Sequence, residues 1–188
     1  MGDINLTNKL KAKMGFKPRV RGRYNSSELY FIVNGMVTPE QWLHPDERTA
    51  KELLMMWGGI GMHGQLEDLL GKEFSEAKRT YQKDGMTLVG KADYLPPHKP
   101  DEVWEFKTSD RKMKEAKPWA LHQTQLYCTM FEKPRGIVYQ PVQNDDGLYL
   151  KEIGVVLRDD AWFDRQIEKL HDFHIDLERL WDGSDLPF

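Results

Sequence analysis

The chain has 188 residues, of which 39% are hydrophobic and 30% charged, and its formal net charge is −3. These values suit one globular domain and exclude both an intrinsically disordered chain and a uniformly basic nucleic-acid coat protein. The sequence has no apolar stretch long enough to span a bilayer, and its first residues lack the apolar block of a secretory signal. We therefore expect a cytoplasmic protein with no membrane anchor.

The start of the chain is basic. The first 23 residues contain seven lysines and arginines but only one aspartate. Gly15, Pro18 and Gly22 would interrupt any long helix there. We predict an irregular basic arm over residues 1–24, followed by a single domain over residues 25–188. The arm could lie on phosphates or be a solvated tail, and its charge fits both alternatives.

Two helical regions are expected before the first long strand. Ser26 and Glu28 are typical of a helix start, and a second start follows Pro45, where acids occupy the first turn. The glycines from Gly58 to Gly61 are expected to end that second helix near Trp57. Helical spacing resumes from Ile60 to Leu70 and places His63 on an apolar face.

The centre of the chain predicts a hairpin followed by a helix. Residues 86–95 alternate well enough for a strand, and residues 101–109 are its expected antiparallel partner. Side chains alternate with period two along a strand, so Glu105 and Lys107 should share one face. A helix is expected over 118–131, with Pro118 in its first turn. Trp119, beside it, is an aromatic residue suited to stacking against a base.

Two further strands are expected over residues 136–142 and 148–157, joined by a turn at 144–147. The last element is a long amphipathic helix whose apolar residues recur at steps of three and four. Those residues are Phe163, Ile167, Leu170, His174, Leu177 and Trp181. The sequence thus predicts a mixed α/β (α+β) fold with a mixed central sheet flanked by helices.

An acid and an acid-x-lysine triplet occupy the two strands of the expected hairpin. Carboxylates from adjacent strands, here Asp93 and Glu105, can bind one Mg²⁺ that water and phosphate complete. The carbonyl of Phe106 is a candidate extra oxygen ligand. Lys107 would stabilise negative charge on a phosphate or orient the attacking water. These residues together predict metal-assisted phosphoryl chemistry.

The same residues belong to an ordered set of motifs. The set is Gly90-Lys-Ala-Asp93, Glu105-Phe-Lys107-Thr108 and Gln123-x-x-x-Tyr127, preceded by His63. It resembles the PD-(D/E)xK nuclease superfamily over roughly residues 26–142. Within it, the chain is similar to the RecB-like exonuclease branch, which includes the CRISPR-associated RecB-like exonucleases. The resemblance implies a restriction-endonuclease-like core.

The resemblance also implies roles for the matching residues. Asp93 and Glu105 would bind the metal with His63 as a further ligand, and an imidazole ligand would make Mn²⁺ a suitable ion beside Mg²⁺. Lys107 would be the catalytic lysine. Gln123 and Tyr127, one helical turn apart, would position that lysine or the DNA backbone.

Many members of this branch hold an iron–sulfur cluster with four cysteines, whereas Cys128 is the only cysteine of this chain. The resemblance is therefore to a subset without an iron–sulfur cluster. In that subset we expect the carboxy-terminal helix, through Phe163 and Trp181, to hold the two ends of the domain together by apolar packing.

The activity expected from the resemblance is exonucleolytic cleavage of DNA ends, with single-stranded DNA favoured. Two alternatives stay open: a catalytically silent module that binds DNA ends, and a sequence-specific endonuclease of the same fold. A protein partner in recombination, repair or CRISPR adaptation, including phage recombination, is a further expectation.

Overall fold

The computed structural model describes residues 7–14, 19–109, 111–145 and 147–182. Within them, six strands form one mixed sheet. The strands are β1 (Arg23–Asn25), β2 (Ser75–Lys83), β3 (Met86–Tyr94), β4 (Glu102–Phe106), β5 (Arg135–Asn144) and β6 (Gly147–Leu157). The helices are α1 (Thr7–Met14), α2 (Ser26–Val33), α3 (Pro39–Leu43), α4 (Ala50–Leu70), the 3-10 turn η1 (Lys72–Phe74), α5 (Pro118–Met130) and α6 (Asp160–Asp182).

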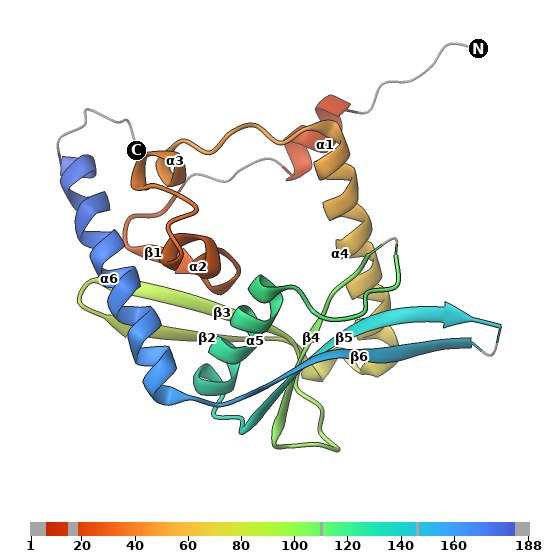
Figure 1. Cartoon of the computed structure of the whole chain (residues 1–188). Helices are drawn as coiled ribbons and strands as arrows, with labels where there is room; N and C mark the ends of the chain where they lie inside the picture. The colour runs from red at the N-terminus through yellow and green to blue at the C-terminus, as the bar shows by residue number, and fades with distance from the viewer. Residues whose placement is uncertain (1–6, 15–18, 110, 146, 183–188) are drawn as a thin grey trace, which may run out of the picture.

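The centre of the sheet is built around β3. This strand pairs in parallel with β1 and in antiparallel fashion with β2. It also pairs in antiparallel fashion with β4 at Tyr94 and Trp104. Next to β4 lies β5 in parallel, and β6 is antiparallel to β5. The predicted mixed sheet flanked by helices is confirmed (Figure 1).

Helices cover both faces of the sheet, as the alternation along β4 demonstrates. Val103 packs in a cluster with Tyr127 and Cys128 of α5. The next side chain, Trp104, belongs to a different cluster that contains Leu66 of α4. Because neighbouring side chains of a strand point to opposite faces, α5 and α4 lie on opposite sides of β4. Glu105 shares the α5 side with Val103.

Two glycines let α5 approach the sheet closely. A Cβ atom at Gly136 of β5 would lie 2.6 Å from Cγ2 of Thr124, and one at Gly90 of β3 would lie 2.8 Å from Sδ of Met130. Three short side chains crowd the space at Gly136, which favours glycine there, whereas at Gly90 the close atoms are the flexible end of Met130. The close approach brings Gln123 and Tyr127 of α5 down onto the strands that carry the candidate acids.

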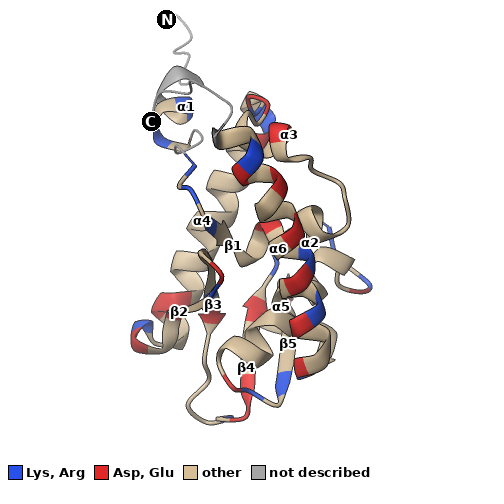
Figure 2. Ribbon diagram, turned by 90° about the vertical axis from the view of Figure 1, so that its left-hand side faces the viewer, with Lys and Arg blue, Asp and Glu red and all other residues tan. Residues whose placement is uncertain are grey.

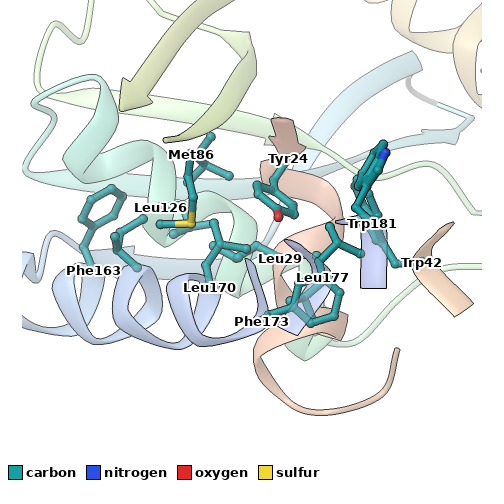
Figure 3. Packing of buried hydrophobic residues seen from close by; sticks show 13 residues of the cluster. Tyr24, Leu29, Trp42, Met86, Leu126, Phe163, Leu170, Phe173, Leu177 and Trp181 are labelled. Atoms are coloured by element: carbon teal, nitrogen blue, oxygen red, sulfur yellow. The ribbon is translucent and has the colours of Figure 1, made fainter. Parts of the chain in front are cut away.

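The amphipathic carboxy-terminal helix is confirmed as α6. Its predicted apolar face is buried, with Leu177 fully inaccessible and Ile167 only 2% exposed. In the same cluster lie Tyr24 of β1 and Trp42 of α3 (Figure 3). The helix therefore packs the beginning of the domain against its end, as expected.

The glycines at 58–61 do not end a helix. One helix, α4, runs from Ala50 to Leu70, and it starts later than the predicted Pro45 because Thr49 and Glu52 form a capping box. Figure 2 shows a long uncharged stretch in it, over residues 53–66. None of the helices in the described part of the chain combines the length and apolar composition needed to cross a membrane.

The amino-terminal region also differs from the prediction of an irregular arm. Thr7–Met14 is a helix, α1, which contacts α4. Residues 1–6 and 15–18 lie outside the described part. The boundary at residue 24 stays a prediction, although Tyr24 is completely buried in the core. The strand β2 was not predicted, because its residues are mostly exposed and polar and lack an apolar alternation.

A buried histidine joins α5 to α6. His122 lies beside Trp162, and its Nε2 is 3.2 Å from Oε1 of Gln166. Its Nδ1 is buried without a hydrogen-bond partner among the described residues. Burial lowers the pKa of His122, because the imidazolium form would lose its hydration.

We expect the free energy of unfolding to fall on acidification because of His122. Its contribution is complete above pH 6.5, the usual pKa in the unfolded chain, and is lost as the pH falls through the lower folded-state pKa. Urea denaturation at pH 7.5 and 5.0 would measure this loss. His122→Gln should reduce the difference between the two pH values, whereas His44→Gln, at an exposed position, should leave it unchanged. An equal pH response in all three proteins would contradict the prediction.

Candidate active site

Asp93 lies where β3 and β4 separate. Its Oδ2 accepts a hydrogen bond of 2.6 Å from the backbone N–H of Phe106, and its Oδ1 lies 3.4 Å from Nδ1 of His63. The aspartate therefore connects the end of β3 to both β4 and α4. Burial opposes the charged form of His63, but the hydrogen bond that the imidazole donates to Asp93 and the charges of Asp93 and Glu105 outweigh it and raise the pKa of the imidazole.

Glu105 is the most deeply buried acid of the site, with 2% of its surface exposed. One oxygen, Oε1, pairs with the ammonium of Lys107. The other, Oε2, is buried without a hydrogen-bond partner in the described part of the chain. Burial and the nearby charge of Asp93 raise the pKa of Glu105 to about 8, and the attraction of Lys107 only partly offsets them.

Lys107 follows directly after β4 and is surrounded on three sides. It donates hydrogen bonds to Oε1 of Glu105 and, over 3.1 Å, to Oε1 of Gln123. Its Nζ also lies 4.8 Å from the ring centre of Trp119, a distance at which an ammonium is attracted to an aromatic face. The ammonium thus has a fixed position between β4 and the start of α5.

A chain of hydrogen bonds continues from Lys107 across α5. Nε2 of Gln123 donates to the hydroxyl of Tyr127 over 2.7 Å. That hydroxyl also accepts a bond of 3.0 Å from Oγ of Ser26, at the start of α2. Burial raises the pKa of Tyr127, so its hydroxyl stays neutral. These hydrogen bonds therefore fix the orientation of the Gln123 amide, which in turn holds the ammonium of Lys107 in place.

The residues fit a divalent cation, although they do not enclose one. In the described part of the chain, no three His, Cys, Asp or Glu side chains converge closely enough to form a metal cage. Mg²⁺, however, is usually bound by one or two carboxylates and completed by water and phosphate. The charge of Asp93 helps to raise the pKa of Glu105, and Oε2 of Glu105 is buried without a hydrogen-bond partner in the described part of the chain. A cation bound here would offset the repulsion between the two acids and would give Oε2 of Glu105 a partner.

A hollow of about 520 Å³ adjoins the other side of Gln123 and Tyr127. Its remaining lining is polar and cationic, apart from Val89, and comes from β1, β2, β3 and the start of α2. These residues are Arg23, Asn25, Ser26, Ser27, Lys78 and Lys91. The cations give the surroundings of the site a charge opposite to that of a phosphate backbone.

The structure brings the predicted site residues together from four separate elements. Hydrogen bonds and close contacts connect His63, Asp93 and Phe106, and a second set connects Glu105, Lys107, Gln123 and Tyr127. Their roles in catalysis stay a prediction, as does the role of the Phe106 carbonyl.

Two neighbours of the site were missed or only partly predicted. The sequence around Ser26 predicts a helix start, and it contains no signal that Ser26 would reach Tyr127. Trp119 was expected as a stacking residue, but its contact with Lys107 depends on how α5 meets β4. Helical periodicity in the sequence gives the direction of a side chain, and contact across elements needs the tertiary fold.

The mixed sheet and its flanking helices form a fold that recurs in solved structures, exonucleases among them. The protein SSO0001 has a TM-score of 0.60 at 18% identity, covering 96% of this chain and 86% of its own. The alkaline exonuclease LHK-Exo from Laribacter hongkongensis, in complex with dAMP, has a TM-score of 0.57 at 13% identity, covering 87% of this chain and 91% of its own.

A phage-related exonuclease from Haemophilus somnus 129PT also shares the fold. Its TM-score is 0.51 at 11% identity, over 95% of this chain and 99% of its own. No family model and no curated protein matches the sequence. At these identities the likeness is one of fold.

Proposed function

We propose that this chain is a metal-dependent DNA nuclease that acts as an exonuclease at DNA ends, with single-stranded ends favoured. The observation that carries the proposal is the buried carboxylate of Glu105, unpartnered at Oε2 and ion-paired with Lys107 at Oε1. A buried acid with an open oxygen is costly unless something cationic binds it. The exonucleases that share the fold support the direction of the proposal.

Asp93 and Glu105 would hold the metal, with His63 and the carbonyl of Phe106 as further ligands. When bound, Mg²⁺ or Mn²⁺ supplies Lewis-acid polarisation of the phosphate and lowers the pKa of a bound water. In the cluster-free subset that the sequence resembles, this ion would be the cofactor, without an iron–sulfur cluster.

Besides the metal, protein side chains would orient the reactants. Lys107 would contact a non-bridging phosphate oxygen and stabilise the charge that develops there. Gln123 and Tyr127 would keep the ammonium in place through their hydrogen bonds. In the reaction, a water oxygen bonds to phosphorus, one phosphorus–ester oxygen bond breaks, and the released oxygen takes up a proton. The products are a phosphomonoester and a hydroxyl end.

The cationic hollow supports DNA as the substrate. Arg23, Lys78 and Lys91 line it next to Gln123 and Tyr127. Lys91 also forms an ion pair with Glu76, so the carboxylate partly neutralises its positive charge. A strand whose phosphates follow this hollow would pass directly by Lys107. We also propose a cytoplasmic location, and a protein partner in recombination, repair or CRISPR adaptation.

Incubation with single-stranded, duplex and flap DNA, labelled at either end, tests the proposal. With Mg²⁺ or Mn²⁺ we expect progressive shortening of the labelled strand from an end, and a chelator should stop it. Discrete internal fragments would instead indicate a sequence-specific endonuclease. Tight binding to DNA ends without turnover in any metal would indicate a silent end-binding module and would overturn the proposed activity.

A further inference from the structure

A second hollow opens on the Trp119 side of the catalytic lysine, between α5 and the chain that follows β4. Its volume is about 220 Å³, equal to about seven water molecules at ~30 Å³ each. This is room for one flat ring system and not for a base pair. Lys107 is part of the lining, so the hollow adjoins the proposed site of chemistry.

The lining combines apolar and cationic residues. Its apolar part comes from Met113, Trp119, Ala120 and Ile153, all of which belong to or pack against one core cluster. The polar part comes from Lys107, Thr108, Ser109 and Lys117, and no carboxylate occurs among these described lining residues. An apolar floor beside two ammonium groups suits a planar ring that is attached to a phosphate.

The wall of the hollow is fixed in place by polar contacts. The backbone N–H of Met113 donates to Oε1 of Gln140 over 2.8 Å, and its carbonyl accepts from Nζ of Lys151 over 2.7 Å. Gln140 itself is 1% exposed. A wall that is already ordered loses little conformational entropy when a ligand binds.

Trp119 supplies the aromatic surface. It is partly exposed, and its ring lies 4.8 Å from Nζ of Lys107. The same side chain is therefore close to both the hollow and the group proposed to contact the phosphate. A base stacked on Trp119 would have its own phosphate within reach of the lysine.

We propose that this hollow binds the base of the nucleotide next to the scissile phosphate, and that Trp119 stacks against that base. The inference rests on the proposed nuclease function and deepens it. Because the hollow holds one ring system, the nucleotide must be unpaired there, which makes single-stranded DNA the substrate. Stacking uses the face that every base has, so no sequence preference is expected.

The test is single-turnover cleavage of an end-labelled single strand that contains one abasic site. For the wild type we expect a pause: cleavage of one bond, at a fixed offset from the abasic site, should slow about tenfold, the order expected for one base–aromatic stack. In Trp119→Ala that extra pause should fall below about twofold, even if every bond is cleaved more slowly. Trp119→Phe should keep it.

The controls separate stacking from other roles of the side chain. Trp119→Leu keeps apolar bulk in the floor and removes the aromatic face, so it should lose the pause even if the alanine variant fails to fold. Trp57→Ala removes an indole that is 52% exposed on α4 and should keep the pause. If Trp119 only positioned Lys107, substituting Trp119 would slow the cleavage of all bonds equally and would leave the pause at the abasic site intact.

Three outcomes would overturn the inference. A wild type that passes the abasic site without pausing shows that the hollow holds no base. A pause of wild-type size in Trp119→Leu shows that Trp119 does not stack. If the wild type cleaves no DNA with either metal, both the proposed nuclease function and this inference fail. In the first two outcomes DNA is still cleaved, so only the inference about the hollow fails.

Discussion

Replacing Glu105 by glutamine is expected to reduce the rate of DNA cleavage by about 10³-fold or more, the range seen when a charge-stabilising group of an active site is removed. Glutamine has the same shape but cannot supply a negative charge to a metal or to Lys107. Burial raises the pKa of Glu105, so the folded protein favours the protonated, uncharged form that glutamine resembles. The melting temperature should therefore stay the same or rise while activity is lost.

The matched control is Glu102→Gln, on the same strand. Glu102 is 8% exposed and accepts a hydrogen bond from Nε1 of Trp104, away from the site. This variant should cleave DNA at the wild-type rate. If Glu105→Gln also cleaves at that rate while folded, Glu105 is not a metal ligand and the assignment of the site is wrong.

The largest effect on stability is expected from Ile167→Ala in α6. Ile167 is 2% exposed within the cluster that joins α6 to Tyr24 and Met86. Truncating such a side chain removes buried apolar surface and leaves a cavity, at a cost of about 2–5 kcal/mol in the free energy of unfolding. Urea denaturation of the variant and the wild type would measure the difference.

Ile175 provides a control of the same residue type on the same helix. It is 37% exposed, so Ile175→Ala should cost less than about 1 kcal/mol. Equal costs for the two substitutions would show that α6 does not stabilise the domain through its buried face. A loss confined to Ile167→Ala supports the role of α6 in holding the beginning and the end of the domain together.

Much of the fold could be predicted because local patterns and tertiary structure agree. The apolar repeat of residues 160–182 is strong, and the structure buries that face. The strands β3 and β4 carry Asp93 and Glu105 in an apolar context, so their pairing followed from the alternation and the turn between them. The candidate site could be predicted because Asp93, Glu105 and Lys107 stand in an ordered set of motifs that resembles a nuclease superfamily.

The remaining features depend on contacts that no local pattern contains. Glycine opposes helix formation by about 1 kcal/mol per residue, so the glycines from Gly58 to Gly61 did not predict a continuous α4. In the structure the backbone at Gly59 approaches Thr108, where a Cβ atom would lie 3.2 Å from its hydroxyl. Ser26 lies 101 residues before Tyr127, and only the folded chain brings the two together.

The most direct test of the account is single-turnover cleavage of end-labelled single-stranded DNA by the wild type, first in a chelator and then after Mg²⁺ or Mn²⁺ is added back. We predict no cleavage in the chelator, recovery with either metal, and no recovery in Asp93→Asn. Intact DNA with both metals, or cleavage that continues in the chelator, would contradict the claim that Asp93 and Glu105 form a metal-dependent nuclease centre.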